Sequence, residues 1–287
     1  MTYVYLNSRM LPAQAAMVPV FDRGFAYGDA LFETLKLTRG RPVFFREHYR
    51  RLMRGLREAG IETAIDHDGL LGQVLSLAEA NQAHSGRLRI QVTRGTPPAP
   101  GGPEPLPGTE PVLLVTAEPF AGYPEAVYAE GIACRTVPFN RGRYARLKST
   151  NLMGVILARQ EAHAAGAQEA ILTSGHGGML EGSYSNIFFL QGGRLITAAG
   201  QNILAGVTRD KVLGLAESAG LEVELRAPQL KELSRHTTSP FLTSSVLGLC
   251  PVREIDGDGF SRDGRVAGLA ARLAALEEAS IEALAVP

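Results

Sequence analysis

The chain has 287 residues, of which 45% are hydrophobic and 20% charged, the usual balance of a soluble globular protein of up to two domains. Its 29 basic and 29 acidic residues give a formal net charge of zero, which argues against a nucleic-acid-binding protein. The two cysteines lack metal-site spacing, and no apolar run approaches the ~18 residues that span a membrane. Because no basic-then-apolar leader opens the chain, we expect a cytoplasmic protein.

The first half of the chain alternates short strands and helices. Residues 31–37 (LFETLKL) show the period of two that predicts a strand, and residues 43–45 (VFF) are predicted to return as a second short strand. A helix is predicted over 48–59, with Gly60 at the position that commonly ends a helix. A second helix is expected over 68–81.

The next segment, residues 87–93 (RLRIQVT), alternates strictly between polar and apolar side chains. Its apolar face predicts contact with a core, and its polar face suits either a ligand site or solvent. Prolines crowd residues 97–111 and predict a loop, after which 111–116 reads as a strand.

The second half continues the alternation, so the sequence predicts α/β or α+β layers. We expect an N-terminal α/β domain over 1–120, a connection over 121–130 and a C-terminal α/β domain over 131–287. The elements predicted in that second domain are strands at 132–137, 170–173, 187–190, 241–244 and 252–255, and helices at 152–165, 208–219 and 266–284.

Few residues show a pattern that indicates chemistry. The six histidines include no HxxxH pair, so no metal site is expected. Lys148, one of only four lysines, lies in a junction ahead of a predicted helix, where a surface lysine is the plain alternative. Glu181 opens a polar turn before an apolar strand. Gly206 precedes a helix whose N-terminus would suit a phosphate, although an ordinary helix start is the simpler interpretation.

Taken together, these segments resemble the class IV aminotransferases, the fold type IV enzymes that use pyridoxal 5′-phosphate (PLP). The resemblance covers residues 21 to about 258 and rests on five segments in the family's order and spacing. These are residues 22–33 (DRGFAYGDALFE), His48-x-x-Arg51-Leu52, Lys148-x-x-Asn151-Leu152, Glu181-Gly182-x-x-Ser185-Asn186 and Gly206-Val207-Thr208-Arg209.

The resemblance implies a two-domain fold type IV enzyme with PLP in the interdomain cleft, and a homodimer. It implies that Lys148 forms a Schiff base with PLP, that Glu181 faces the ring nitrogen and that Arg51 pairs with the phosphate. The other cofactor-binding residues that it implies are Ser185, Asn186, Gly206, Val207, Thr208, Ser244 and Ser245.

Substrate residues are less constrained, because the chain departs from each well-known subgroup. Phe32 stands where D-amino-acid transaminases have a tyrosine, and their arginine–histidine pair is missing after Thr93-Arg94-Gly95. The tyrosine that branched-chain transaminases carry after the lysine is also missing. Tyr27 or Phe32 is expected to line the substrate pocket, and an arginine to bind the substrate carboxylate. The candidates are Arg89, Arg94, Arg141, Arg143 and Arg146, with Arg89 favoured by its strand face.

The predicted function is therefore amino-acid transamination, in which an amino group moves between an amino acid and a 2-oxo acid. The alternative is 4-amino-4-deoxychorismate lyase, which releases pyruvate and 4-aminobenzoate. It is supported by short matches at residues 32–34, 87–89, 146–149 and 245–247. A PLP-binding protein without catalysis is a distant alternative, because both Lys148 and Glu181 are present. No nucleic-acid or membrane partner is expected.

Overall fold

A computed structural model describes residues 1–99 and 102–284 of the chain. It divides into two compact units. The first unit comprises Met1–Gly122, Leu147–Asn151 and the described residues from Glu278 onward, and the second comprises Tyr123–Arg146 and Leu152–Glu277. The division differs from the one expected, since the Lys148 segment groups with the first unit. It does so because its backbone pairs with a strand of that unit, as described below.

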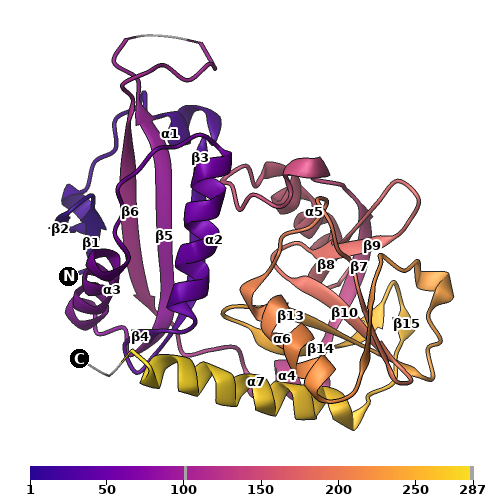
Figure 1. The fold of residues 1–287 in the computed structure, drawn as a ribbon. Helices are drawn as coiled ribbons and strands as arrows, with labels where there is room; N and C mark the ends of the chain where they lie inside the picture. The colour runs from indigo at the N-terminus through magenta and orange to yellow at the C-terminus, as the bar shows by residue number, and fades with distance from the viewer. Residues whose placement is uncertain (100–101, 285–287) are drawn as a thin grey trace. The chain divides into compact units, whose positions relative to one another are not determined.

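The first unit is built on a six-stranded antiparallel sheet with the order β2-β1-β6-β5-β3-β4 (Figure 1). Strands β3 and β5 pair from Ala30–Thr93 to Thr38–Ser85, and this register fixes which of their side chains share a face. The strands are β1 (Tyr3–Leu6), β2 (Arg9–Pro12), β3 (Ala30–Thr38), β4 (Arg41–Pro42), β5 (Ser85–Thr96) and β6 (Glu110–Pro119).

Helices α2 (Phe45–Glu58) and α3 (His67–Ala80) cover one face of this sheet, and the short α1 (Arg23–Tyr27) precedes β3 (Figure 1). One apolar core joins the helices to the sheet. Its fully buried members include Leu56 of α2, Leu77 of α3 and Leu88 of β5. Because side chains alternate along a strand, Glu33, Leu35 and Leu37 point toward the helices while Phe32 points to the opposite face.

The short strand predicted over 43–45 is wrong. β4 ends at Pro42, Phe44 adopts a left-handed backbone (φ 53°), and α2 begins at Phe45. Three consecutive apolar residues carry no periodicity, so the pattern could not separate a strand from a buried helix start. The closure of α2 was predicted correctly: Gly60 has a φ of 64°, and Ile61 N–H donates to Leu56 C=O at 2.8 Å.

The second unit is built on a nine-stranded mixed sheet, in which β7 runs parallel to both β8 and β14. The order is β12-β11-β10-β13-β14-β7-β8-β9, with β15 pairing to β14. The strands are β7 (Ile132–Pro138), β8 (Glu169–Thr173), β9 (Met179–Gly182), β10 (Asn186–Gln191), β11 (Arg194–Thr197), β12 (Glu222–Leu225), β13 (Thr238–Ser244), β14 (Gly248–Ile255) and β15 (Asp258–Gly259).

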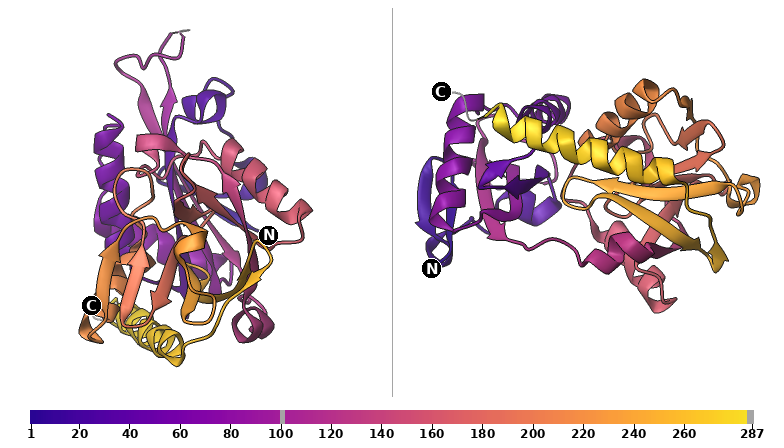
Figure 2. Two further views of the ribbon diagram at one scale, coloured as in Figure 1. Left: turned by 90° about the vertical axis from the view of Figure 1, so that its right-hand side faces the viewer. Right: turned by 90° about the horizontal axis from the view of Figure 1, so that it is seen from below.

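The remaining α-helices of the described residues are α4 (Glu125–Glu130), α5 (Met153–Ala164), α6 (Val207–Ser218) and α7 (Gly264–Glu282) (Figure 2). Three short 3-10 helices lie at Ala13–Ala15, Gly142–Tyr144 and Leu230–Glu232. Both cysteines, Cys134 and Cys250, are buried in the core of the second unit. Burial raises the pKa of the Cys250 thiol to about 12, so it stays protonated and unreactive at neutral pH.

No helix within residues 1–99 and 102–284 is long and apolar enough to span a bilayer. Over the same ranges, no three His, Cys, Asp or Glu side chains gather as a metal ion would require.

Candidate active site

The segment that carries Lys148 lies against the beginning of β3. Phe32 N–H donates to Lys148 C=O at 2.9 Å, and Thr150 N–H donates to Ala30 C=O at 3.0 Å. An antiparallel bridge pairs Leu31 with Ser149. Backbone pairing from Lys148 to Thr150 fixes the position of the Lys148 backbone beside β3.

A close approach between Gly28 and Asn151 holds the far end of this segment. Gly28 has a left-handed φ of 68° and its carbonyl accepts from Thr150 Oγ1 at 3.0 Å and from Asn151 Nδ2 at 3.2 Å. A Cβ at Gly28 would come within 2.3 Å of Asn151 Oδ1. Glycine is required here both for the backbone angle and for the space.

Phe32 brings Lys148 and Arg89 together on the sheet face that the helices do not cover. Lys148 Nζ lies 4.6 Å from the centroid of the Phe32 ring, and Arg89 Cζ lies 3.9 Å from it. Gln91, which pairs with Phe32 across the strands, accepts hydrogen bonds from Arg89 Nε at 3.2 Å and Nη2 at 2.9 Å. Arg89 and Lys148 thus both contact the ring of Phe32, and Gln91 fixes the orientation of the Arg89 guanidinium.

Arg51 lies on the other side of β3, where α2 packs. Its Nε and Nη2 donate to the two oxygens of Glu33 at 2.8 and 2.6 Å, and His48 Nδ1 lies 2.7 Å from Glu33 Oε2. Only about 1% of the Glu33 and His48 side chains and 10% of the Arg51 side chain are exposed. Arg51 is therefore a guanidinium whose orientation is set by a buried carboxylate.

The charges of this cluster follow from its surroundings. Burial alone would raise the pKa of Glu33, but Arg51 and, less strongly, His48 hold it at about 2. Burial lowers the pKa of His48; Glu33 opposes this shift, while the charges of Arg51 and Lys148 lower the pKa further. At neutral pH the cluster consists of an anion, a cation and a neutral imidazole. Lys148 lies within electrostatic reach of that imidazole.

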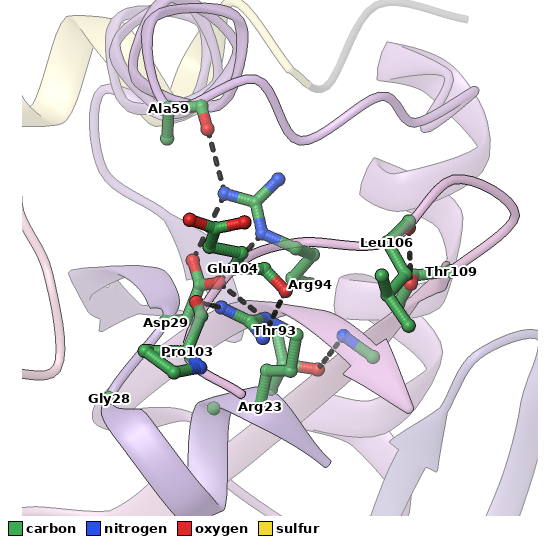
Figure 3. Close-up of polar contacts among 12 residues, drawn as sticks. Arg23, Gly28, Asp29, Ala59, Thr93, Arg94, Pro103, Glu104, Leu106 and Thr109 are labelled. Carbon is green, nitrogen blue, oxygen red and sulfur yellow. Dashed lines mark hydrogen bonds and ion pairs between the residues drawn. The ribbon is translucent and has the colours of Figure 1, made fainter. Parts of the chain in front are cut away.

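Arg94 is a substrate residue candidate from the sequence, but its guanidinium makes hydrogen bonds to other residues of the chain (Figure 3). Its Nε and Nη2 donate to Asp29 at 2.7 and 3.1 Å, and its other hydrogen bonds reach Gly60 C=O at 2.6 Å and Ala59 C=O at 2.8 Å. Burial alone would raise the pKa of Asp29, but Arg94 and Arg23 together lower it. Arg94 holds the end of α2 to the start of β3, so its geometry argues against a substrate role.

Arg23 extends the same network toward the proline-rich loop, of which residues 100 and 101 lie outside the described chain. It donates to Asp29 Oδ2 at 2.9 Å and to the backbone carbonyls of Gly102, Pro103 and Glu104 (Figure 3). Its guanidinium also lies 5.0 Å from the ring centroid of Tyr27, the other proposed pocket residue, which is 47% exposed. The structure thus places Tyr27 on α1 beside this clamp, whereas Phe32 lies beside Lys148.

In the second unit, Glu181 ends up buried although its sequence context is a polar turn. Its Oε1 lies 3.3 Å from Arg141 Nη1, and its Oε2 accepts from Leu204 N–H at 2.9 Å. Only 5% of the Glu181 side chain is exposed. Behind the turn, Glu169 accepts hydrogen bonds from Ser183 and from Arg159, which fixes the course of the chain after Glu181.

The start of α6 forms a second polar cluster in the same unit. Gly206 caps the helix without a side-chain hydrogen bond, and a Cβ there would lie 2.2 Å from Asn186 Oδ1. Asn186 Nδ2 donates to Leu204 C=O at 2.9 Å, and Thr208 is buried in the first turn. The first amides of α6 have no partner within their own helix, which is the usual arrangement for binding an anion.

Three buried hydroxyls of this unit lack a hydrogen-bond partner among the described residues: Thr238 Oγ1, Ser185 Oγ and Thr243 Oγ1. Thr243 pairs with Asn186 across β13 and β10, and β13 packs against α6. Ser244 and Ser245 follow at the end of β13, where Ser244 Oγ accepts from Leu247 N–H at 3.3 Å. A buried hydroxyl without a partner is costly, so the positions of Ser185 and Thr243 suit a polar ligand.

Sequence reasoning did not identify Glu33 as the partner of Arg51, Arg141 as the partner of Glu181, or Thr243 as a buried hydroxyl. A signal existed for Glu33, because it alternates with Leu35 and Leu37 and so occupies an inward position that a carboxylate fills only with a partner. Arg141 stands forty residues from Glu181, and no local pattern links them.

The chain matches the class IV amino-transferase family over residues 30–255. It is 32% identical over 255 residues to the D-alanine aminotransferase of Bacillus licheniformis, with 88% of each chain covered. It therefore belongs to the class IV aminotransferases, a family of transaminases and lyases, and it is an enzyme with the two-domain fold of that family.

Two solved structures illustrate the breadth of the fold. The T.th. branched-chain amino acid aminotransferase, solved with pyridoxamine 5′-phosphate, has a TM-score of 0.87 at 24% identity, covering 96% of this chain and 94% of that one. The 4-amino-4-deoxychorismate lyase of Pseudomonas aeruginosa has a TM-score of 0.81 at 29% identity, covering 94% and 97%. The likeness to these structures spans both reaction types.

The buried Glu33 cluster yields a stability prediction. Glu33→Gln should lower the free energy of unfolding by about 3 kcal/mol, because it removes the negative charge that the buried Arg51 guanidinium faces. Since the folded pKa of about 2 lies below the ordinary 4.5, this stabilisation is complete above pH 4.5 and is lost as pH falls toward 2. Urea denaturation at pH 7 and pH 3 measures it. The exposed Glu62→Gln is the control, and equal stabilities of the two variants at pH 7 would contradict the account.

Proposed function

We propose that this enzyme is a PLP-dependent amino-acid aminotransferase. The observation that carries the proposal is the placement of Lys148 and Arg89 on one aromatic ring. A primary amine could hold the aldehyde of PLP until the amino group of a substrate replaces it, and a fixed guanidinium could pair with the carboxylate that every 2-amino acid carries. The curated relative that matches along 88% of its length is an aminotransferase.

The residues of the second unit fit the phosphate and polar edge of PLP. The first amides of α6, at Val207 and Thr208, could donate hydrogen bonds to a dianionic phosphate. The hydroxyls of Ser185 and Thr243, which have no partner among the described residues, could donate to other acceptor atoms of the cofactor. We propose that Gly206, Asn186, Ser244 and Ser245 complete this cradle. Arg51, oriented by Glu33, is proposed as a bidentate phosphate partner.

Bound PLP supplies an aldehyde for amine chemistry and a ring that accepts electrons from a developing carbanion. Lys148 is proposed to hold the cofactor between turnovers and, once displaced by the substrate amine, to move a proton at the substrate Cα. Glu181 is proposed to hold a proton at the ring nitrogen. Its buried carboxylate is suited to that role because Arg141 and Leu204 N–H already compensate its charge.

Arg89 is proposed to bind the substrate carboxylate. Arg89→Gln should raise KM for the amino acid roughly tenfold to hundredfold, the loss expected for one charge-assisted hydrogen bond. Arg87→Gln is a matched control, because Arg87 lies two residues away on the same strand, with its guanidinium 3.7 Å from the Phe120 ring centroid. Steady-state kinetics should show KM within about twofold of wild type for the control. An unchanged KM for Arg89→Gln would place the carboxylate elsewhere.

Lyase activity on 4-amino-4-deoxychorismate is the second candidate, favoured by the 29% identity to the solved Pseudomonas aeruginosa lyase. The two reactions differ in where the substrate's nitrogen goes. A transaminase retains the amino group on the cofactor until a 2-oxo acid removes it. The lyase expels pyruvate and leaves the cofactor unchanged.

A half-reaction separates these candidates. Enzyme loaded with PLP is mixed with a panel of L- and D-amino acids without any 2-oxo acid. We expect about one equivalent of 2-oxo acid per active site, with conversion of the cofactor to its amine form followed by absorbance. If no amino acid converts the cofactor while 4-amino-4-deoxychorismate yields pyruvate and 4-aminobenzoate catalytically, the enzyme is the lyase.

The homodimer and the cytoplasmic location implied by the resemblance and the sequence stay predictions.

A further inference from the structure

Arg141, one of five arginines that the sequence offered for the substrate carboxylate, is bound to Glu181. Its Nη1 lies 3.3 Å from Glu181 Oε1, while Leu204 N–H donates to the other oxygen at 2.9 Å. Only 15% of the Arg141 side chain and 5% of the Glu181 side chain are exposed. Both oxygens of the Glu181 carboxylate therefore have a partner: the charged Arg141 guanidinium at one and the Leu204 backbone N–H at the other.

We propose that Arg141 is a positioning residue that keeps Glu181 ionised, so that a proton shared between Glu181 and the cofactor ring nitrogen stays on the nitrogen. The inference rests on the proposed function above, because it concerns the ring that Glu181 is proposed to face. In this proposal Arg141 influences the protonation of the cofactor ring nitrogen and does not bind the substrate carboxylate.

Arg141 acts on Glu181 and on the ring from different distances. The guanidinium contacts the carboxylate directly, so a ring that binds to the same carboxylate lies one contact further away. A nearby cation therefore stabilises the negative charge on Glu181 more than it disfavours a positive charge on the ring. The balance moves the shared proton from oxygen to nitrogen. Burial strengthens the effect, because little water is present to screen it.

The turn that follows β7 places Arg141 next to Glu181. Arg141 follows β7 in a turn where Gly142 has a left-handed φ of 68° and its N–H donates to Asn140 Oδ1 at 2.8 Å. The neighbouring Arg143 is exposed and donates to the Tyr144 hydroxyl at 2.6 Å. Two arginines of one turn thus point to different partners, and Arg141 is the one that binds Glu181.

The test uses PLP labelled with ¹⁵N at the ring nitrogen, bound to the holoenzyme. Its NMR shift separates a protonated ring nitrogen from a neutral one. Arg141→Met should move the signal toward the neutral position, in the direction of Glu181→Gln, and Arg141→Gln should do the same. Arg141→Lys, which keeps the charge, should restore most of the wild-type shift, and Arg143→Met should leave it unchanged.

Kinetics supply a second readout. Removing outer partners of metal ligands typically changes activity by 10- to 100-fold, and we expect a loss of roughly that order in kcat for Arg141→Met, with KM little changed.

The outcomes distinguish the two levels of the argument. If Glu181→Gln shifts the ring signal while Arg141→Met and Arg141→Gln match wild type, the role of Arg141 is refuted and the proposed function survives. If Glu181→Gln itself leaves the signal unchanged, or if wild-type protein holds no PLP, the proposed function fails.

Discussion

The candidate site depends on the backbone hydrogen bonds that attach residues 148–150 to β3. They fix the position of Lys148 relative to a strand whose side chains alternate between two environments. Phe32 points to the face opposite α2 and meets Arg89, whereas Glu33 points toward α2 and meets Arg51. One strand register thereby sets the surroundings of the amine, the proposed carboxylate site and the proposed phosphate partner. A slip by one residue would exchange the two faces and disperse all three.

Buried carboxylates clamped by arginine recur throughout the molecule. A buried charge is costly unless it is paired and its hydrogen-bonding capacity is met, and a guanidinium can satisfy two oxygens with fixed geometry. In the first unit such pairs hold elements together. At Glu181 the same device surrounds a group with a proposed chemical role. These carboxylates are the half-buried Asp29 with Arg23 and Arg94, and the buried Glu33 with Arg51 and His48, Glu169 with Arg159, and Glu181 with Arg141.

Periodicity and glycine placement were sufficient to predict most of the fold. The strand over 31–37 and the helix that Gly60 closes were predicted because their signals are local. Family-like segments predicted Lys148 and Glu181 as candidates, and the structure finds Lys148 pinned to β3 and Glu181 buried. Their catalytic roles stay predictions.

What could not be predicted depends on contacts distant in sequence. Residues 147–151 join the first unit through pairing with β3, which no local pattern encodes. The sequence alone does not show which of the five candidate arginines binds a substrate carboxylate. Only their partners separate Arg94, bound to Asp29, and Arg141, bound to Glu181, from Arg89, which lies beside Lys148 on Phe32.

The central claim is that Lys148 is the amine that holds PLP, and peptide mapping tests it most directly. Protein incubated with PLP is reduced with borohydride, digested and analysed by mass spectrometry. The chain has only four lysines, so each can be followed. The account predicts that the reduced pyridoxyl group is found on Lys148 and on no other lysine, at close to one group per chain. Labelling at Lys36, Lys211 or Lys231 with Lys148 unmodified would contradict it.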